Sequence, residues 1–577
     1  YAFEDGDDKG PFSIVITLII FTLFRIYSSL WEYAGIEEVF SLIAACLAAA
    51  VAKLVIISFT WSVMPRSWYV LDTIYLMILI GATRVSYRLI RLRRQNRTFP
   101  WSKRKKVMII GGGEAGRSLI TEIQNSKYLD QKVVCIIDDD PYKIGRYIKG
   151  VKVVGNRNSI KKSVKKYNVQ QIILTIPSAN AAKIRPIVEI CQDTNCELMI
   201  LPGVYQLVNG EVRASKLRPV NIDDLLGRDE VYVNLDEVMD YVSGRVIMVT
   251  GGGGSIGSEL CRQIAKHSPK QLIIFDIYEN NAYDIQQELL REQPKLDLVV
   301  LIGSVRDENR INSIFEQYRP EIIYHAAAHK HVPLMEGSPN EAIKNNVLGT
   351  YNMVRMADKW NAKRFVQIST DKAVNPTNIM GASKRICEMI IQTYNKESNT
   401  EYVAVRFGNV LGSNGSVIPL FKKQIAEGGP VTVTHPEIIR YFMTIPEAVS
   451  LVLQAGAYAK GGEIFVLDMG EPVKILDLAR NMIRLSGYKV DQDIKIEFTG
   501  LRPGEKLYEE LLMDEEGMTD TPNKLIHIGH PIDVDEVKLA HALRVLESAA
   551  QNETDDMRLI VESIVPTYHP KLNKSTQ

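Results

Sequence analysis

The fold is decided by the stretch RVIMVTGGGGSIGSELCRQIA at residues 245–265. A short apolar run leads into a turn that contains Gly251, Gly254 and Gly257, and a helical pattern of apolar residues follows. Glycines at this spacing between a strand and a helix let the backbone approach a pyrophosphate, which lies at the helix N-terminus. The stretch therefore predicts a doubly wound α/β domain with a parallel sheet that binds a dinucleotide.

The residues that follow this motif predict which dinucleotide binds. Nineteen residues after Gly257, the apolar run QLIIFD ends at Asp276. A carboxylate there accepts hydrogen bonds from both ribose hydroxyls of NAD and repels the extra phosphate of NADP. No arginine follows directly, so NAD is the predicted cofactor. The predicted cofactor contacts are Gly251, Gly254, Ser255, Ile256, Gly257, Asp276, Asp307, Ala326, Ala327 and Lys384.

An earlier glycine motif lies in KVMIIGGGEAGRSLI at residues 106–120. Gly111, Gly113 and Gly116 follow a short apolar run, and the next apolar run ends at Asp138. This pattern predicts another Rossmann-like domain before the first one described. The same glycines also serve tight packing of a helix on a strand, so the motif leaves open whether this earlier domain holds a nucleotide.

The N-terminal part of the chain differs from the rest in composition. Three apolar segments, at residues 12–24, 39–52 and 68–83, each meet a charged residue, and none is an uninterrupted apolar run of about 18 residues. We expect transmembrane helices here, with a soluble helical domain as the alternative. Ten lysines or arginines and no acid lie between Arg84 and Lys106. Beside apolar helices, such a run favours anionic lipid over nucleic acid, and it predicts that everything after it lies in the cytoplasm.

These patterns divide the chain into a membrane part and two Rossmann-like domains with a linker between them. About three crossings are expected, and because the sequence opens without Met, an earlier one is expected to be missing. The net charge of +1 gives no overall field that would attract nucleic acid. The expected boundaries are 1–95 for the transmembrane helices, 104–216 for the first Rossmann-like domain, 217–244 for the linker and 245–577 for the catalytic domain.

The stretch STDKAVNPTNIMGASK at residues 369–384 carries the residues expected to perform the chemistry. Many nicotinamide enzymes that oxidise sugar hydroxyls have Tyr-x-x-x-Lys, in which the Tyr takes the hydroxyl proton. Here Met380 occupies the Tyr position, four residues before Lys384, and a thioether cannot move a proton. The Thr-Asp-Lys triplet at residues 370–372 follows an apolar run, at the carboxyl edge of the predicted sheet where such folds bind ligands. The triplet is therefore the candidate source of the acid–base groups that Met380 cannot provide.

Six motifs together give the chain a family resemblance. They are TGGGGSIG (250–257), HAAAHKHVP (325–333), NNVLGT (345–350), STDKAVNPTNIMGASK (369–384), RFGNVLGSNGSVIPLF (406–421) and LRPGEKL (501–507). With them the chain resembles the extended short-chain dehydrogenase/reductases that act on nucleotide sugars, and most nearly the membrane-anchored UDP-N-acetylglucosamine 4,6-dehydratases of bacterial glycan and capsule synthesis. The resemblance implies UDP-N-acetylglucosamine as substrate, a recycled NAD, a smaller C-terminal substrate-binding part, a multi-pass bacterial inner-membrane location and a homodimer.

The resemblance also implies roles for single residues. The family's reaction passes hydride from sugar C4 to NAD, removes the C5 proton, expels the C6 hydroxyl as water and returns the hydride to C6. Asp371 is implied as the acid at C6 and Lys372 as the base at C5. Thr370 is expected to position the C4 hydroxyl, Lys384 to hold the nicotinamide ribose, and Met380 to exclude water. The expected substrate contacts are His329, Arg406, Asn409, Arg440, Arg502 and Glu505.

Two other functions remain open at this stage. A nucleotide-sugar epimerase also uses transient oxidation, although it usually keeps the Tyr and needs no Asp-Lys pair. A non-catalytic scaffold of a glycan-assembly complex would account for the missing Tyr by loss of activity. No metal is expected, because no acid or Cys completes a ligand set with His325, His329 and His331. The sequence does not indicate the C5 configuration of the product, the downstream pathway or the oligomeric state.

Overall fold

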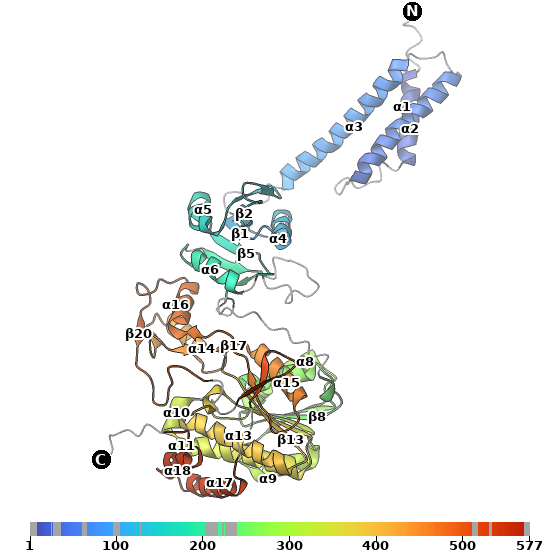
Figure 1. The fold of residues 1–577 in the computed structure, drawn as a ribbon. Coiled ribbons are helices and arrows are strands. Elements are labelled where there is room, and N and C mark those ends of the chain that lie inside the picture. Colours follow the sequence, from blue (N-terminus) through green and yellow to red (C-terminus); the bar gives the residue numbers. More distant parts are fainter. Residues whose placement is uncertain are drawn as a thin grey trace, which may run out of the picture. The chain divides into compact units, whose positions relative to one another are not determined.

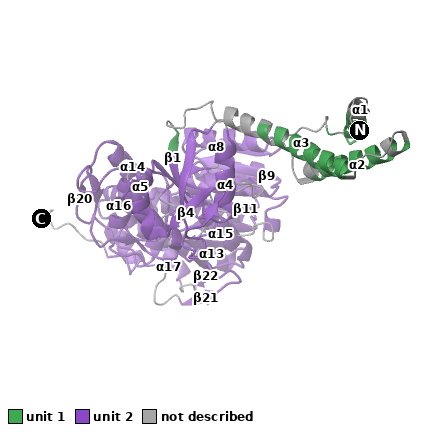
Figure 2. Cartoon of the chain, turned by 90° about the horizontal axis from the view of Figure 1, so that it is seen from above, with its two compact units in different colours: residues 1–105 green, residues 106–577 purple. Residues whose placement is uncertain are grey.

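The computed structural model describes most of the chain. The described residues are 9–24, 26, 36–60, 66–95, 104–126, 129–179, 181–194, 196–201, 217–221, 224, 239–510, 517–529 and 534–569. They form two compact units, Tyr1–Lys105 and Lys106–Gln577 (Figure 2). Most of the predicted linker at 217–244 lies outside the described residues.

The first unit consists of helices α1 (Lys9–Leu23), α2 (Ile36–Thr60) and α3 (Arg66–Gln95) (Figure 1). Their contacts are apolar, and the buried cluster includes Phe21, Leu42, Ala45 and Cys46. One ion pair joins α2 to α3, in which Lys53 Nζ lies 2.7 Å from Asp72 Oδ2 and the Lys53 side chain is almost fully buried.

This unit corrects the prediction of N-terminal transmembrane helices. Among the described residues, none of the helices combines the length and the apolar character needed to cross a membrane. The 15 residues of α1 rise about 22 Å, less than the roughly 30 Å of a bilayer core. Lys53 in α2 and Asp72 in α3 place charges within the other two helices. The prediction that these helices cross a membrane is therefore wrong, as is the multi-pass inner-membrane location based on it. Much of the basic run between Arg84 and Lys106 lies outside the residues whose side chains are described.

The second unit opens with a sheet that follows the first glycine motif. Its described strands lie in the order β3-β4-β2-β1-β5-β6-β7. The pairs β2–β4, β1–β5 and β5–β6 are parallel. The helices of this part are α4 (Glu114–Asn125), α5 (Ile160–Tyr167) and α6 (Ala181–Gln192). The strands are β1 (Lys105–Ile110), β2 (Gln131–Ile137), β3 (Tyr147–Ile148), β4 (Val151–Gly155), β5 (Gln171–Leu174), β6 (Glu197–Ile200) and β7 (Arg218–Pro219).

A larger sheet follows the second glycine motif. Its described strands lie in the order β10-β9-β8-β11-β12-β13-β18-β22-β21, and the first seven in this order are parallel. The strands are β8 (Val246–Thr250), β9 (Gln271–Asp276), β10 (Leu298–Ile302), β11 (Ile322–His325), β12 (Arg364–Ile368), β13 (Glu401–Arg406), β18 (Ile464–Leu467), β21 (Met518–Asp520) and β22 (Ile526–Gly529). The strand order reverses between β8 and β11, and folds of this kind bind ligands at such a switch point.

Helices cover both faces of this sheet (Figure 1). Neighbouring residues of one strand enter different apolar clusters, as alternation along a strand requires: Met248 belongs to one cluster and Val249 to the other. One face carries α7 (Ser255–Ala265), α8 (Glu279–Glu292) and α15 (Ile445–Tyr458). The other carries α9 (Glu308–Tyr318), α12 (Gly349–Lys359), α13 (Ile379–Glu397), α17 (Glu536–Gln551) and α18 (Met557–Ile564). The two parallel sheets agree with the predicted pair of Rossmann-like folds.

Shorter elements complete the second unit beside the sheet. Three small two-stranded pairings, β14–β17, β15–β20 and β16–β19, lie near α14 and α16. Their bounds are β14 (Asn409–Val410), α14 (Val417–Ala426), β15 (Val431–Val433), β16 (Ile439–Arg440), β17 (Phe442–Met443), β19 (Val473–Lys474), α16 (Ile475–Leu485) and β20 (Ile496–Phe498). The helical turns α10 (Val332–Gly337) and α11 (Pro339–Ala342) precede the π-helical turn Ile343–Leu348.

Candidate active site

The glycine turn between β8 and α7 has the shape that a dinucleotide requires. A Cβ on Gly257 would lie 2.0 Å from the Gly251 carbonyl oxygen, so only glycine lets α7 pack this closely on the turn. Gly251 has φ +66°, and a Cβ there would meet Ala327 at 2.8 Å. Gly254 is the N-cap residue of α7, so the N-terminus of this helix lies at the glycine turn. The turn therefore fits a pyrophosphate.

Asp276 lies at the end of β9, as the sequence predicts for the ribose-binding carboxylate. Its Oδ2 accepts a hydrogen bond from Gly253 N at 2.8 Å, and Oδ1 accepts one from Tyr278 N at 2.8 Å. A carboxylate has about four acceptor positions, so both oxygens retain capacity for hydroxyls. Asp307 has a local role, because its Oδ1 accepts from Arg310 N and caps α9.

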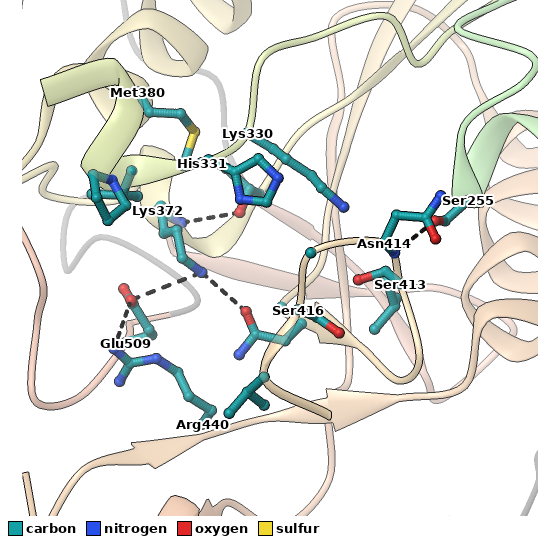
Figure 3. A pocket seen from close by; sticks show the side chains of 18 of the residues that line it. Ser255, Lys330, His331, Lys372, Met380, Ser413, Asn414, Ser416, Arg440 and Glu509 are labelled. Carbon is teal, nitrogen blue, oxygen red and sulfur yellow. Dashed lines mark hydrogen bonds and ion pairs between the residues drawn. The ribbon is translucent and has the colours of Figure 1, made fainter. Parts of the chain in front are cut away.

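A cavity of about 790 Å³ opens beside this turn. It is lined by the turn itself, by the loop after β11, by the segment between β12 and α13, and by the chain around residues 407–417 and 499–509 (Figure 3). Cavities of this size hold cofactors and drug-sized ligands. Predicted residues that line it are Gly251, Gly254, Ser255, Ile256, Gly257, Ala326, His329, Thr370, Lys372, Met380, Lys384, Asn409, Arg440, Arg502 and Glu505. Asp276, Asp307, Ala327, Asp371 and Arg406 are not among the lining residues.

The Thr-Asp-Lys triplet forms a tight hydrogen-bonded group at the carboxyl end of β12. Thr370 Oγ1 donates to Asp371 Oδ1 at 2.8 Å, and Lys372 Nζ donates to the same oxygen at 2.9 Å. Lys372 Nζ also donates to Asn409 Oδ1 at 3.3 Å. The side chain of Asp371 is 1% exposed, and within the described part of the chain its Oδ2 has no hydrogen-bond partner. The triplet thus holds a buried acid against an amine that reaches the cavity.

The charge state of Lys372 is set by its neighbours. Burial alone would lower its pKa, but the charges of Asp371 and Glu509 and the hydrogen bond to Asp371 outweigh burial and raise the pKa. Lys372 is therefore an ammonium ion in this arrangement. To act as a base it must first pass a proton on, and Asp371 lies at hydrogen-bond distance.

Lys384 lies one helical turn after Met380 on α13. Its Nζ donates to the Ile368 carbonyl at 3.0 Å, and burial lowers its pKa. Behind it, His325 is enclosed between Thr250 Oγ1 and Thr350 Oγ1, and burial lowers the pKa of His325 to about 3. This histidine is neutral and structural, and of the two residues it is Lys384 that lines the cavity.

Met380 lines the cavity at the first turn of α13 (Figure 3). The residue is 3% exposed and belongs to the apolar cluster on that face of the sheet. Gly381, the next residue, brings the helix against the turn Asp371–Ala373, called the catalytic turn below because of its proposed role; a Cβ on Gly381 would lie 2.2 Å from the Lys372 carbonyl oxygen. The close packing of α13 on this turn fixes where Met380 and Lys384 lie.

Arg406 does not face the cavity, although it was expected to contact substrate. It is fully buried at the end of β13 and pairs with Glu388 of α13, with Nη2 2.7 Å from Oε2. Arg385 lies 2.9 Å from the same carboxylate, and Ser369 donates to it. The expectation failed because the sequence does not show in which direction an arginine at the end of a strand points. The same motif is compatible with a side chain that faces the ligand and with one that faces the helix behind the sheet.

The other predicted cations and acids gather at one end of the cavity. Arg440 Nη2 lies 3.6 Å from Glu505 Oε1, and Arg502 Nη2 lies 3.1 Å from the same oxygen. The Arg502 side chain is half exposed, whereas Arg440 is buried and donates to the carbonyls of Ile439, Leu507 and Lys506. An exposed guanidinium beside the cavity can bind phosphate oxygens in a forked manner.

His329 also lines the cavity and lies in the loop after β11. Its Nε2 is 3.2 Å from Arg306 Nη2, and burial and the Arg306 charge lower its pKa. Within the described residues, no group of three or more His, Cys, Asp or Glu side chains is placed to hold a metal ion.

Three ionisable residues of the described cavity lining were not anticipated as site residues from the sequence. Lys330 and His331 line the cavity, and Glu509 lies beside Lys372 and Arg440 (Figure 3). A signal existed for Lys330 and His331, because both belong to the HAAAHKHVP motif. Glu509 follows LRPGEKL in a run of two acids, and nothing in the sequence distinguishes it from the exposed Glu510.

Comparisons with known proteins agree with this architecture. A model of a polysaccharide biosynthesis protein family matches residues 247–531, and a CoA-binding domain model matches residues 23–202. The capsular polysaccharide biosynthesis protein CapD of Staphylococcus aureus is 47% identical over 499 residues, which cover 86% of this chain and 82% of that protein. The probable polysaccharide biosynthesis protein EpsC of Bacillus subtilis is 44% identical over 518 residues, which cover 89% of this chain and 85% of that protein. A UDP-glucose 4-epimerase of Rickettsia bellii is 36% identical over 47% of this chain and 79% of its own length.

Two solved structures resemble about half of the chain. The structure of Pen from Bacillus thuringiensis is 34% identical and covers 50% of this chain and 90% of that one, with a TM-score of 0.47. DesIV, a dTDP-glucose 4,6-dehydratase from Streptomyces venezuelae with NAD and TYD bound, is 20% identical. The match covers 54% of this chain and 99% of that one, with a TM-score of 0.41. Neither likeness indicates what this chain binds. From the near full-length match to CapD, the chain belongs to the CapD-like family of extended short-chain dehydrogenase/reductases of polysaccharide biosynthesis.

Proposed function

We propose that this chain is an NAD-dependent 4,6-dehydratase of UDP-N-acetylglucosamine, which forms a UDP-4-keto-6-deoxy amino sugar. The observation that carries the proposal is the hydrogen-bonded Asp371–Lys372 pair at the edge of the sheet, beside a cavity in which Met380 stands where a Tyr would be expected. An elimination needs an acid and a base held close together, and this pair supplies both types of group.

NAD fits the residues at the glycine turn. Gly251, Gly254 and Gly257 leave room for a pyrophosphate that any side chain would fill, and Asp276 would accept the ribose hydroxyls. When bound there, NAD supplies the acceptor and later the donor of a hydride. Lys384, whose ammonium group lies in the same cavity, would hold the ribose nearest the reacting ring.

The triplet can manage each proton that the reaction moves. The C4 hydroxyl would lose its proton toward Thr370, whose own hydroxyl already donates to Asp371. In the elimination, the Lys372 amine takes the C5 proton while the Asp371 carboxyl gives a proton to the C6 hydroxyl. The C5–H and C6–O bonds break, a C5–C6 double bond forms and water leaves. Afterwards Lys372 is an ammonium and Asp371 a carboxylate. When C6 is reduced, the Lys372 ammonium returns a proton to C5, and the Asp371 carboxylate is ready to receive the next C4 proton through Thr370.

Met380 supports the chemistry without moving a proton. Its thioether forms an apolar wall of the cavity and keeps water from a ketone intermediate. At the far end, Arg502 is available for the diphosphate and Glu505 for the uridine ribose, as the LRPGEKL motif implies for this family.

A nucleotide-sugar epimerase is the second candidate, because a UDP-glucose 4-epimerase is among the relatives. One incubation separates the two. Purified protein mixed with UDP-N-acetylglucosamine and NAD should give a product that has lost one water and carries a ketone, seen by mass spectrometry and by trapping with hydroxylamine. A product of unchanged mass would instead indicate epimerisation, and no product at all would contradict both.

A further inference from the structure

Glu509 is an ionisable residue of the cavity for which the proposed reaction has no task. It ends the segment 499–509 that borders the cavity, and its side chain is 4% exposed. Carboxylates are rarely buried to this extent unless they are paired with a cation. Its position therefore calls for a partner.

Two cations flank this carboxylate. Glu509 Oε1 lies 3.8 Å from Lys372 Nζ and 3.8 Å from an Arg440 guanidinium nitrogen (Figure 3). At these distances both contacts are ion pairs, and neither is short enough to be a hydrogen bond. Within the described residues, Oε2 of Glu509 is buried and has no hydrogen-bond partner. One oxygen thus touches the proposed base, and the other has spare capacity inside the cavity wall.

The surroundings of Glu509 come from three segments. Asp371 and Lys372 belong to the turn after β12, Arg440 belongs to β16, and Lys506 precedes Glu509 in its own segment. The pKa of Glu509 is raised, because burial and the nearby Asp371 charge outweigh the charges of Lys372, Arg440 and Lys506, which lower it. Asp371 and Glu509 in turn are the two anions that keep Lys372 charged.

We propose that Glu509 is a positioning residue for Lys372: its carboxylate holds the amine at the cavity wall and sets the pH at which that amine is free to accept a proton. The role of Lys372 as a base rests on the proposed dehydratase function, but the coupling of the two residues does not. Loss of the Glu509 charge removes one of two anions beside the ammonium, so Lys372 loses its proton at lower pH.

Competitive labelling tests the coupling directly on the full chain. Acetic anhydride reacts with neutral amines, and the extent of acetylation of Lys372 at each pH is read from its peptide by mass spectrometry. In Glu509→Gln the midpoint of Lys372 labelling should move to lower pH by about 1–3 units, the usual effect of a charge at this range. The matched control is Glu510→Gln, which removes the adjacent exposed carboxylate and should leave the midpoint where it is.

A second variant keeps the test decisive if Glu509→Gln folds poorly. Glu509→Asp stays charged but draws the carboxylate back from Lys372, so its midpoint should lie between those of the unmutated chain and Glu509→Gln. A midpoint that does not change in either variant would overturn the coupling.

Turnover then separates this proposal from the proposed function. If the unmutated chain forms the keto product, the rising limb of its kcat/KM against pH should move to lower pH in Glu509→Gln, whereas a merely structural residue would lower the rate equally at every pH. A labelling shift without any keto product would support the coupling and refute the dehydratase. Keto product without a shift in either profile would leave the dehydratase standing and refute the coupling.

Discussion

Asp371 is the single side chain on which the proposed proton transfers depend most. Asn at this position keeps the shape and the acceptor for Thr370 and Lys372, but it cannot give a proton to a leaving hydroxyl. Asp371→Asn should therefore slow formation of the keto product by about 10²–10⁴-fold, the range typical of lost acid–base help. The measurement is kcat at fixed pH, with NAD binding as a check on folding.

Met380→Leu provides the contrasting variant at the same cavity. Leu has nearly the same volume and is equally unable to move a proton, so most activity should remain. Full activity in Asp371→Asn together with complete loss in Met380→Leu would contradict this division of work.

Glu388 explains why Arg406 serves stability. Burial raises the pKa of Glu388, but the charges and hydrogen bonds of Arg406 and Arg385 outweigh it and lower the pKa from 4.5 to about 2. A lowered carboxylate pKa stabilises the fold above pH 4.5, and this contribution is lost as the pH falls toward 2. Glu388→Gln should cost about 3–5 kcal/mol near neutral pH, because two guanidinium groups then lose this buried partner.

Unfolding in denaturant at several pH values checks this assignment. The difference in unfolding free energy between the unmutated chain and Glu388→Gln should be full at pH 7 and shrink below pH 4.5. Equal stability of the two at pH 7 would show that Arg406 does not depend on this pair.

Most of the site residues predicted from the sequence line the cavity, because the glycine turn and the Thr-Asp-Lys triplet are local motifs. Sequence patterns could not identify Glu509, whose place beside Lys372 arises only when the segment 499–509 returns to the cavity. They also misplaced Arg406, since the direction of a side chain at the end of β13 depends on Glu388 of a different element.

At the scale of elements, the contact between α13 and the catalytic turn decides the geometry of the cavity. Gly381 is the closest point, and an Ala there would push its Cβ to 2.2 Å from the Lys372 carbonyl oxygen. Either the helix or the turn must move, and misplacement by about 1 Å can cost roughly 10²-fold in rate. We therefore expect Gly381→Ala to lower kcat by about 10²-fold and to lower Tm.

Gly337→Ala is the matched control, because a Cβ on this helical glycine meets nothing within 4 Å. It should keep both kcat and Tm. Unchanged turnover in Gly381→Ala would show that the approach of α13 is not needed for the chemistry.

The parallel strands of both sheets were predictable from short apolar runs that alternate with helical patterns. The N-terminal helices also lie over the apolar segments of the sequence, but the sequence did not show that they fail to qualify as membrane spans. An apolar run gives little information on whether charges such as Lys53 and Asp72 meet inside a helical bundle. In the sequence, Lys53 interrupts an apolar run. In the structure, the ion pair with Asp72 of α3 stabilises Lys53 inside the helical bundle.

For the whole molecule, the division into two units carries its own prediction. All of the proposed chemistry lies in the unit Lys106–Gln577. A chain that begins at residue 104 should therefore keep the kcat and KM of the full chain for the keto product. A truncated chain that binds NAD and UDP but shows no turnover would mean that residues before 104 contribute to the chemistry.

The central claim is that one cavity oxidises C4, eliminates water across C5 and C6, and returns the same hydride to C6. The most direct test is a reaction in heavy water with UDP-N-acetylglucosamine that carries deuterium at C4, followed by NMR of the product. The account predicts a 4-keto sugar with the C4 deuterium transferred to C6 and one solvent deuterium at C5, with no net change in NAD. A product that keeps its C6 hydroxyl, or one in which the C6 position carries no deuterium from C4, would contradict it.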